Sequence, residues 1–382
     1  MTQKSALTGV RILDMSRMLP GPYCSMILAD HGADVIAIED RKFQEEGLFF
    51  NELNRNKRHM TLNLKSKEGI EIFRRLSSEV DVIIEGFRPG VVKRLGVDYE
   101  TVKKYNPGII YCAISGYGQT GPYIDRVGHD VNYLSYAGVL GLIGEKRRPP
   151  VIPGVQVADI LGGGMNAALG ILLALYARGR GGKGQYIDIS ITDGLLSTLF
   201  LPNFFAESNS SQPKPSDGML SHRYGCYNTY ETRDGRFLSI GAVENKFWHK
   251  LCAHIKKPEF SRLQYDEKHK DIIIESLRKI FKSKTIAEWE DELSDLEVCY
   301  AKVQNLAEVL DDTLFKERQM VFKYSGKDGK KKSSFAVPVK LSSTPGSIRT
   351  SPQDFGEATR EILLENGYSN EQIDSFIAQG VV

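Results

Sequence analysis

Short β-rich runs alternate with amphipathic segments over the first half of this chain, and this alternation constrains its fold more than any other feature. Four runs rich in Val and Ile predict strands: VRILDMS (10–16), DVIAIED (34–40), VDVIIEG (80–86) and GIIYCAISGYG (108–118). Two segments between them predict helices: GPYCSMILADHGA (21–33) and KEGIEIFRRLSSE (67–79). Strands joined through helices run parallel, so we predict an α/β fold with a Rossmann-like parallel sheet, whose ligands bind beyond the carboxyl ends of the strands.

The second half of the chain has a different organisation. The segment SNSSQPKPSDG (208–218) is rich in Ser, Pro and Gly and predicts a linker at 208–221, which follows a large domain at 1–207. Beyond it, YNTYETRDGRFLSIGAV (227–243) predicts a hairpin with an Asp-Gly turn. Helical segments continue to about Leu314, and a polar hairpin and a C-terminal helix pair follow. We therefore predict a second, smaller α+β domain.

Composition excludes several classes of protein. The net charge is +2 over 382 residues, so there is no general attraction to nucleic acid or to an anionic membrane. The five cysteines are scattered without CxxC spacing, which argues against disulfides and against a zinc site, and favours a reducing cytoplasm. The longest apolar run, Met165 to Ala177, is too short to span a bilayer. We expect a cytoplasmic protein with no nucleic-acid partner, no membrane partner and no bound metal.

Two possible proton carriers lie beside glycine-rich turns that are predicted to open helices. These are His129 in VGHDVNY and Asp159 in VADILGGG. An imidazole and a carboxylate can remove a proton from a weakly acidic carbon and return it, and N–H groups at a helix start can hold the anion formed. A lone histidine in a turn is more often structural, and Asp159 could simply be the N-cap of its helix. The two readings of Asp159 are compatible.

Basic residues recur at turns that follow the predicted strands: Arg41, Lys57, Arg58, Lys65, Arg88 and Arg94. A solvated face is the default explanation. Their placement at strand ends also favours a phosphate-bearing ligand, because Arg and Lys bind phosphate by charge-assisted hydrogen bonds. The segment GVLGLIG, Gly138 to Gly144, has glycines without the dinucleotide-binding spacing, and no GxxxxGK[ST] occurs, which disfavours nicotinamide binding and nucleotide hydrolysis. Glu244 follows a predicted strand and could cap the next helix.

Motifs spread over nearly the whole chain resemble the family III CoA-transferase superfamily, and within it the α-methylacyl-CoA racemase branch. They occur in order and include LPGPYCSMILADHGADVIAIE, IIEGFRPGVVKRLGV, SGYGQTGPY, GHDVNY, ADILGGG and GAVENKFW. The resemblance implies an interlocked homodimer in which each subunit threads the other. It also implies that the C-terminal segment 325–382 rejoins the large CoA-binding domain, which leaves 222–324 as the small domain.

The resemblance further implies a reaction. Transferases and racemases share the aspartate matched by Asp159, which is a nucleophile in the former and one of two bases in the latter. His129 in GHDVNY, with Glu244 to hold it, is the racemase form. The implied activity is inversion of the 2-position of 2-methylacyl-CoA thioesters through an enolate, with expected N–H donors at the helix start of Asp159 and in the turn Gly128 to Asp130. The alternatives are a CoA-transferase that acts through Asp159, and a catalytically silent CoA-binding protein.

The resemblance assigns CoA to the basic residues. Arg41, Lys65, Arg88 and Arg94 match positions near its adenine, ribose phosphate and pyrophosphate, and no cofactor is implied beyond the CoA moiety of the substrate. Within NRNKRH (54–59) several cations are expected to be able to reach the same phosphate.

Overall fold

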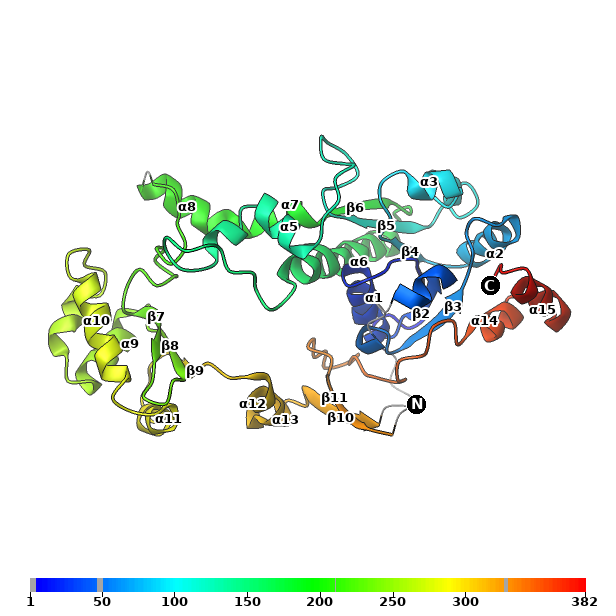
Figure 1. The fold of residues 1–382 in the computed structure, drawn as a ribbon. Coiled ribbons are helices and arrows are strands. Elements are labelled where there is room, and N and C mark those ends of the chain that lie inside the picture. The colour runs from blue at the N-terminus through cyan, green and yellow to red at the C-terminus, as the bar shows by residue number, and fades with distance from the viewer. Residues whose placement is uncertain (1–4, 47–50, 210, 326–328) are drawn as a thin grey trace. The chain divides into compact units, whose positions relative to one another are not determined.

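The structure is a computed structural model that describes residues 5–46, 51–209, 211–325 and 329–382. Its contacts divide the chain into two compact units, traced in Figure 1. The large unit contains Met1–Val139, Pro153–Thr198 and Glu317–Val382, and the small unit contains Leu140–Ile152 and Leu199–Lys316. The chain therefore leaves the large unit twice, and its last segment returns to the unit in which it began.

A six-stranded parallel sheet forms the centre of the large unit (Figure 1). Its strands are β1 (Arg11–Asp14), β2 (Asp34–Glu39), β3 (Lys57–Thr61), β4 (Val82–Glu85), β5 (Ile110–Ser115) and β6 (Tyr186–Ser190). They are ordered β3-β2-β1-β4-β5-β6, and every neighbouring pair is parallel. The predicted parallel α/β sheet is confirmed. The order reverses between β1 and β4, and ligands of such sheets bind at that switch point.

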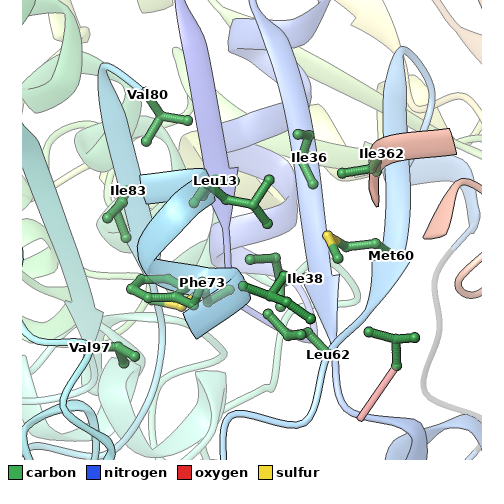
Figure 2. Packing of buried hydrophobic residues seen from close by; sticks show 14 of the residues in the cluster. Leu13, Ile36, Ile38, Met60, Leu62, Phe73, Val80, Ile83, Val97 and Ile362 are labelled. Carbon is green, nitrogen blue, oxygen red and sulfur yellow. The ribbon is translucent and has the colours of Figure 1, made fainter. Parts of the chain in front are cut away.

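Helices cover the sheet, and both ends of the chain contribute to one core. Figure 2 shows Leu13, Ile36 and Met60 of the sheet packed with Phe73 of α2 (Lys67–Ser77) and Ile362 of α14 (Thr359–Glu365), all at most 2% exposed. The last helices of the chain therefore complete a core that the first strands begin. The helices of this unit are α1 (Pro20–Asp30), α2 (Lys67–Ser77), α3 (Val91–Leu95), α4 (Tyr99–Val102), α5 (Asp130–Tyr136), the π-helical η4 (Ala158–Met165), α6 (Asn166–Gly179), α7 (Ile191–Leu196), α14 (Thr359–Glu365) and α15 (Asn370–Ala378).

The segment 54–59 anchors the returning C-terminal segment to α1. Arg55 is buried, and its Nη2 lies 2.6 Å from Oδ2 of Asp30. The side-chain amide of Asn56 donates to Asp30 and to the carbonyl oxygen of Ser347, at 2.8 and 2.9 Å. Since buried charges need partners, this network has to form for the C-terminal segment to seat correctly.

The next two residues begin β3, a strand that the sequence analysis missed because its first residues are basic. Lys57 is 1% exposed, and its Nζ donates to the carbonyl oxygen of Pro22 at 2.8 Å. Arg58 lies 3.0 Å from Asp34 and 2.6 Å from Glu365. Both cations are therefore held within the fold. The expectation that several cations of this segment reach one phosphate is wrong for these two.

Glycines allow η4 to lie directly against its neighbours. A Cβ added at Gly163 would lie 2.9 Å from Cβ of Pro20, and one added at Gly162 would lie 2.5 Å from the carbonyl oxygen of Ile191. Real Cβ atoms do not approach that closely, so the GGG triplet is what permits this packing of η4 on α1 and α7. The position of Asp159 depends on this close approach.

One helical stretch of the described chain, Ala158–Gly179, passes a length and composition test for a membrane span. It has 22 residues, a mean hydropathy of 1.7 and 39% of its apolar window buried within this chain. Core helices of soluble proteins pass the same test. No membrane span was expected from the apolar run Met165 to Ala177. The helical stretch is longer than this run because the glycine-rich segment η4 continues directly into α6.

The small unit contains an antiparallel sheet in the order β7-β8-β9. The predicted hairpin is confirmed: its Asp-Gly turn joins β7 to β8, and Gly235 has a φ of 75°. The buried side chains of Tyr230, Trp248 and Phe281 form the core. The elements are α8 (Phe200–Asn209), β7 (Tyr227–Glu231), β8 (Phe237–Gly241), α9 (Asn245–His254), α10 (Lys270–Phe281), α11 (Ile286–Leu293), β9 (Tyr300–Lys302), α12 (Leu306–Asp311) and, where the two units meet in sequence, α13 (Thr313–Glu317).

The predicted polar hairpin is present in the large unit. It consists of β10 (Val321–Ser325) and β11 (Lys331–Phe335), which pair antiparallel. Its connecting residues 326–328 lie outside the described part of the chain.

Candidate active site

A cavity of about 670 Å³ lies in the large unit at the switch point of the sheet. Two of its walls are the loops that follow the strands flanking that point, Ser16–Met18 after β1 and Gly86–Pro89 after β4. The loop after β5 and the turn before α5 complete the lining, together with Asp159. The cavity thus opens where α/β sheets bind their ligands.

His129 lines this cavity from the N-cap position of α5. Its backbone N–H donates to Oδ1 of Asn132 at 3.0 Å, and the hydroxyl of Tyr133 donates to the carbonyl oxygen of Gly128 at 2.5 Å. These bonds fix the turn, while the imidazole is exposed in this chain. Of the three N–H groups expected to hold an anion here, that of His129 is engaged, and those of Gly128 and Asp130 donate to no described residue.

Asp159 lies in the first turn of η4 and is partly buried. The N-cap is Val157, so the reading of Asp159 as the cap is wrong. Oδ2 of Asp130 accepts hydrogen bonds from the backbone N–H of Ala158 at 2.7 Å and of Asp159 at 3.1 Å. Because those N–H groups are occupied, the expectation that they hold an enolate is wrong. They instead join the GHD turn to the start of η4, which brings His129 and Asp159 to one cavity.

The site raises the proton affinity of Asp159. The pKa of Asp159 is raised to about 6, chiefly by burial and in addition by the neighbouring Asp130, while His129 opposes the rise. A carboxyl group in this range both gains and loses a proton readily near neutral pH. Within the described ranges, no group of three or more His, Cys, Asp or Glu side chains is arranged to hold a metal ion. Among the described residues, the site therefore offers two proton carriers, His129 and Asp159, which come from separate segments of the chain.

Arginines surround the same cavity. Arg88 lines it as the sequence analysis expected, and Arg17 and Arg126 line it as well. The guanidinium of Arg126 lies 4.1 Å from the ring centroid of Tyr123. Arg17 and Arg126 were missed, although the first directly follows a predicted strand and the second lies two residues before the GHD motif; both positions are signals that could have found them.

The other predicted CoA-binding cations lie outside this cavity. Arg41 and Lys65 line a second cavity of about 250 Å³ near the ends of β2 and β3. Val381 and Val382 also line it, a contribution that the sequence did not indicate. Arg94 is exposed on α3 and lines neither cavity. In contrast to Lys57 and Arg58, the four cations Arg41, Lys65, Arg88 and Arg94 make no ion pair with any described residue, so they remain available to an anionic ligand.

Glu244 lies in the small unit, where it occupies the N-cap position of α9. This position at the start of the helix agrees with the sequence-based prediction. Its pairing with His129, which lies in the large unit, stays a prediction.

Comparisons with known proteins agree with this architecture. A family model described as CoA-transferase family III matches residues 7–359. The chain is 35% identical to mouse α-methylacyl-CoA racemase over 96% of its own length and 95% of that protein, and 31% identical to the β subunit of a succinyl-CoA–L-malate CoA-transferase from Chloroflexus aurantiacus over 98% of each. The crystal structure of a CaiB/BaiF family protein from Brucella suis superposes with a TM-score of 0.83 at 28% identity, covering 95% of this chain and all of that one. This chain therefore belongs to CoA-transferase family III.

Proposed function

We propose that this protein inverts the 2-position of 2-methylacyl-CoA thioesters by proton transfer through an enolate. The observation that carries the proposal is that His129 and Asp159 line the same cavity. A transferase that forms an aspartyl intermediate requires only the carboxylate, whereas inversion requires a second proton carrier. The similarity to mouse α-methylacyl-CoA racemase supports the same choice.

The two carriers would act on opposite faces of the α-carbon. One removes the proton while the other, already protonated, delivers a proton to the other face. The pKa of Asp159, at about 6, lies in the range where imidazoles ordinarily exchange protons, so transfer in both directions is feasible. The backbone N–H groups of Gly128 and Asp130 are available to hold the enolate oxygen, and in this proposal Glu244 orients His129.

The charge of the site suits an acyl-CoA. CoA carries phosphates, and Arg17, Arg88 and Arg126 line the catalytic cavity, while Arg41 and Lys65 line the second one. Arginine and lysine bind phosphate through charge-assisted hydrogen bonds. We propose that the CoA moiety runs over the carboxyl ends of the strands between these cations, and that no further cofactor takes part.

Hydrogen exchange tests the proposed reaction directly. In deuterated water each enantiomer of 2-methyldecanoyl-CoA is expected to gain deuterium at the α-carbon and to convert to the same mixture of enantiomers, as followed by mass spectrometry and chiral chromatography. A panel of straight-chain, branched and aromatic acyl-CoAs would define the acyl group. Absence of exchange with the whole panel, together with transfer of CoA to an added carboxylate, would establish the transferase instead.

We also propose that the protein is a homodimer, interlocked as the family resemblance implies. Exposed apolar side chains form a stripe along η4 and α6: Leu161, Met165, Leu169, Leu172, Leu173 and Tyr176. Their spacing places them on one helix face, and contiguous apolar patches of this kind mark interfaces. Sedimentation equilibrium is expected to give twice the chain mass. Replacing Leu169 and Leu173 with Glu should prevent dimerisation, while Ile377→Glu, an exposed apolar position on α15, should not; a monomeric wild type would refute the proposal.

A further inference from the structure

The two strands that flank the switch point end in the same way. β1 ends at Asp14 and β4 ends at Glu85, and each of these side chains is 2% exposed. Each carboxyl group accepts the backbone N–H two residues further on: that of Ser16 at 2.9 Å for Asp14, and that of Phe87 at 2.7 Å for Glu85. The loops tied in this way are the two walls that open the catalytic cavity.

The two carboxyl groups differ in their surroundings. Nζ of Lys57 lies 3.9 Å from Asp14, and the hydroxyl of Ser25 donates to the same carboxylate. Glu85 forms no salt bridge with any residue in the described part of the chain. In the sheet, Glu85 pairs with Ala113 of β5, and Ala113 pairs with Asp188 of β6.

The described groups of β5 and β6 that interact electrostatically with Glu85 are all acidic. They are Tyr111 and Cys112 of β5 and Tyr186 and Asp188 of β6. The pKa of Glu85 is raised to about 8; burial is the largest cause, the N–H of Phe87 opposes the rise, and Asp188 contributes to it. Glu85 therefore keeps its proton at neutral pH, whereas Asp188 is exposed and more readily carries a charge.

We propose that Glu85 is a positioning residue for the CoA moiety: its carboxyl group fixes the loop Gly86–Pro89 and thereby the direction of Arg88. Arg88 is exposed and lines the cavity from this loop. A loop that is held by one buried hydrogen bond presents its cation in a single arrangement, which lowers the conformational cost of binding a phosphate.

Loss of the proton from Glu85 should keep the hydrogen bond from Phe87, which a carboxylate accepts more strongly, but should draw Arg88 away from the ligand. A buried negative charge without a partner is costly, and Arg88 is the basic residue of the same loop. The ionised Glu85 then competes with the ligand's phosphate for Arg88. CoA binding should therefore weaken as the pH rises through about 8, the pKa of Glu85.

Calorimetric titration of CoA between about pH 6 and about pH 9 tests this inference, which rests only on CoA binding by the family and not on racemisation. Glu85→Gln is neutral at every pH and can still accept the N–H of Phe87, so we expect wild-type affinity at neutral pH without the alkaline loss. Glu85→Met has similar length but no comparable acceptor and should weaken binding about tenfold, because one charge-assisted contact is misplaced. With acyl-CoA, Glu85→Met should raise KM and leave kcat close to that of wild type.

Asp98→Asn is the matched control. Asp98 caps α4 in the same unit by accepting the N–H of Thr101 at 3.3 Å, it does not line the cavity, and asparagine caps helices equally well. This variant should follow the wild type at every pH. An alkaline loss of affinity in Glu85→Gln equal to that of the wild type would overturn the inference, even if Glu85→Met fails to fold. Absence of α-proton exchange with unchanged CoA binding would overturn the proposed racemisation instead.

Discussion

Replacing His129 with alanine is expected to abolish inversion of 2-methyldecanoyl-CoA, with a loss of about 10³-fold or more, because a positioned acid or base contributes on that scale. The loss of α-proton exchange should affect only one of the two enantiomers. Asp159 remains able to remove and return a proton on its own face, so one enantiomer should still exchange its α-proton without inverting. The rate of deuterium uptake by each separate enantiomer measures this asymmetry.

The fold should survive this change. The GHD turn is held by hydrogen bonds to backbone groups of Gly128 and His129, not by the imidazole, and the imidazole is exposed. CoA binding should therefore stay close to that of the wild type. His269→Ala, which removes an exposed histidine paired with Asp266 in the small unit, is the control and should invert its substrate normally. An unchanged inversion rate in His129→Ala would remove His129 from the catalytic pair.

Replacing Asp159 with asparagine is expected to reduce inversion by about 10³-fold or more, since the amide has nearly the same shape but does not carry a proton. The wild-type rate should follow the same bell-shaped pH profile in both directions, because each direction needs one proton on the pair: one member accepts a proton while the other, protonated, donates one. The rate should fall as the pH drops below about 6, where Asp159 becomes protonated along with His129, and again at high pH, where both have lost their protons. Initial rates from each pure enantiomer should give coinciding profiles.

Asp130→Asn provides a control for the electrostatic part of this argument. The negative charge of Asp130 raises the pKa of Asp159, so its removal should move the acid side of the pH profile to lower pH in both directions. The asparagine oxygen still accepts the N–H groups of Ala158 and Asp159, so the turn should be retained. Mass spectrometry of the wild type after incubation with acyl-CoA should show no covalent adduct on Asp159. A trapped acyl or CoA adduct there would instead identify a transferase.

The parallel sheet was predictable because most of its strands can be recognised from their amino-acid composition. Four of its strands are short runs of Val, Ile and Ala between turn residues, and these runs are typical of buried parallel strands. β3 was missed because KRHMT begins with two cations, and sequence patterns do not show that Asp14 and Pro22 receive the Lys57 ammonium in the interior. A buried lysine is recognisable only once its partners from other segments are known.

The candidate site was predictable in its residues but not in its construction. His129 and Asp159 were recognisable from the chemistry of the GHD and ADILGGG motifs. The hydrogen bond that the N–H of Ala158, at the start of η4, donates to Asp130 joins groups 28 residues apart in the chain and leaves no local signal. For that reason the N–H groups at the helix start were assigned to a ligand, whereas the protein itself uses them.

The hydrogen bond between Ala158 and Asp130 joins the two ends of a segment that leaves the large unit and returns to it. The chain leaves the large unit after Val139, contributes Leu140–Ile152 to the small unit, and returns at Pro153. The hydrogen bonds between Asp130 and the start of η4 hold His129 and Asp159 near each other. The length and sequence of Leu140–Ile152 can therefore vary without separating the two proton carriers. Substitutions or insertions in Leu140–Ile152 should therefore leave the spacing of His129 and Asp159 intact.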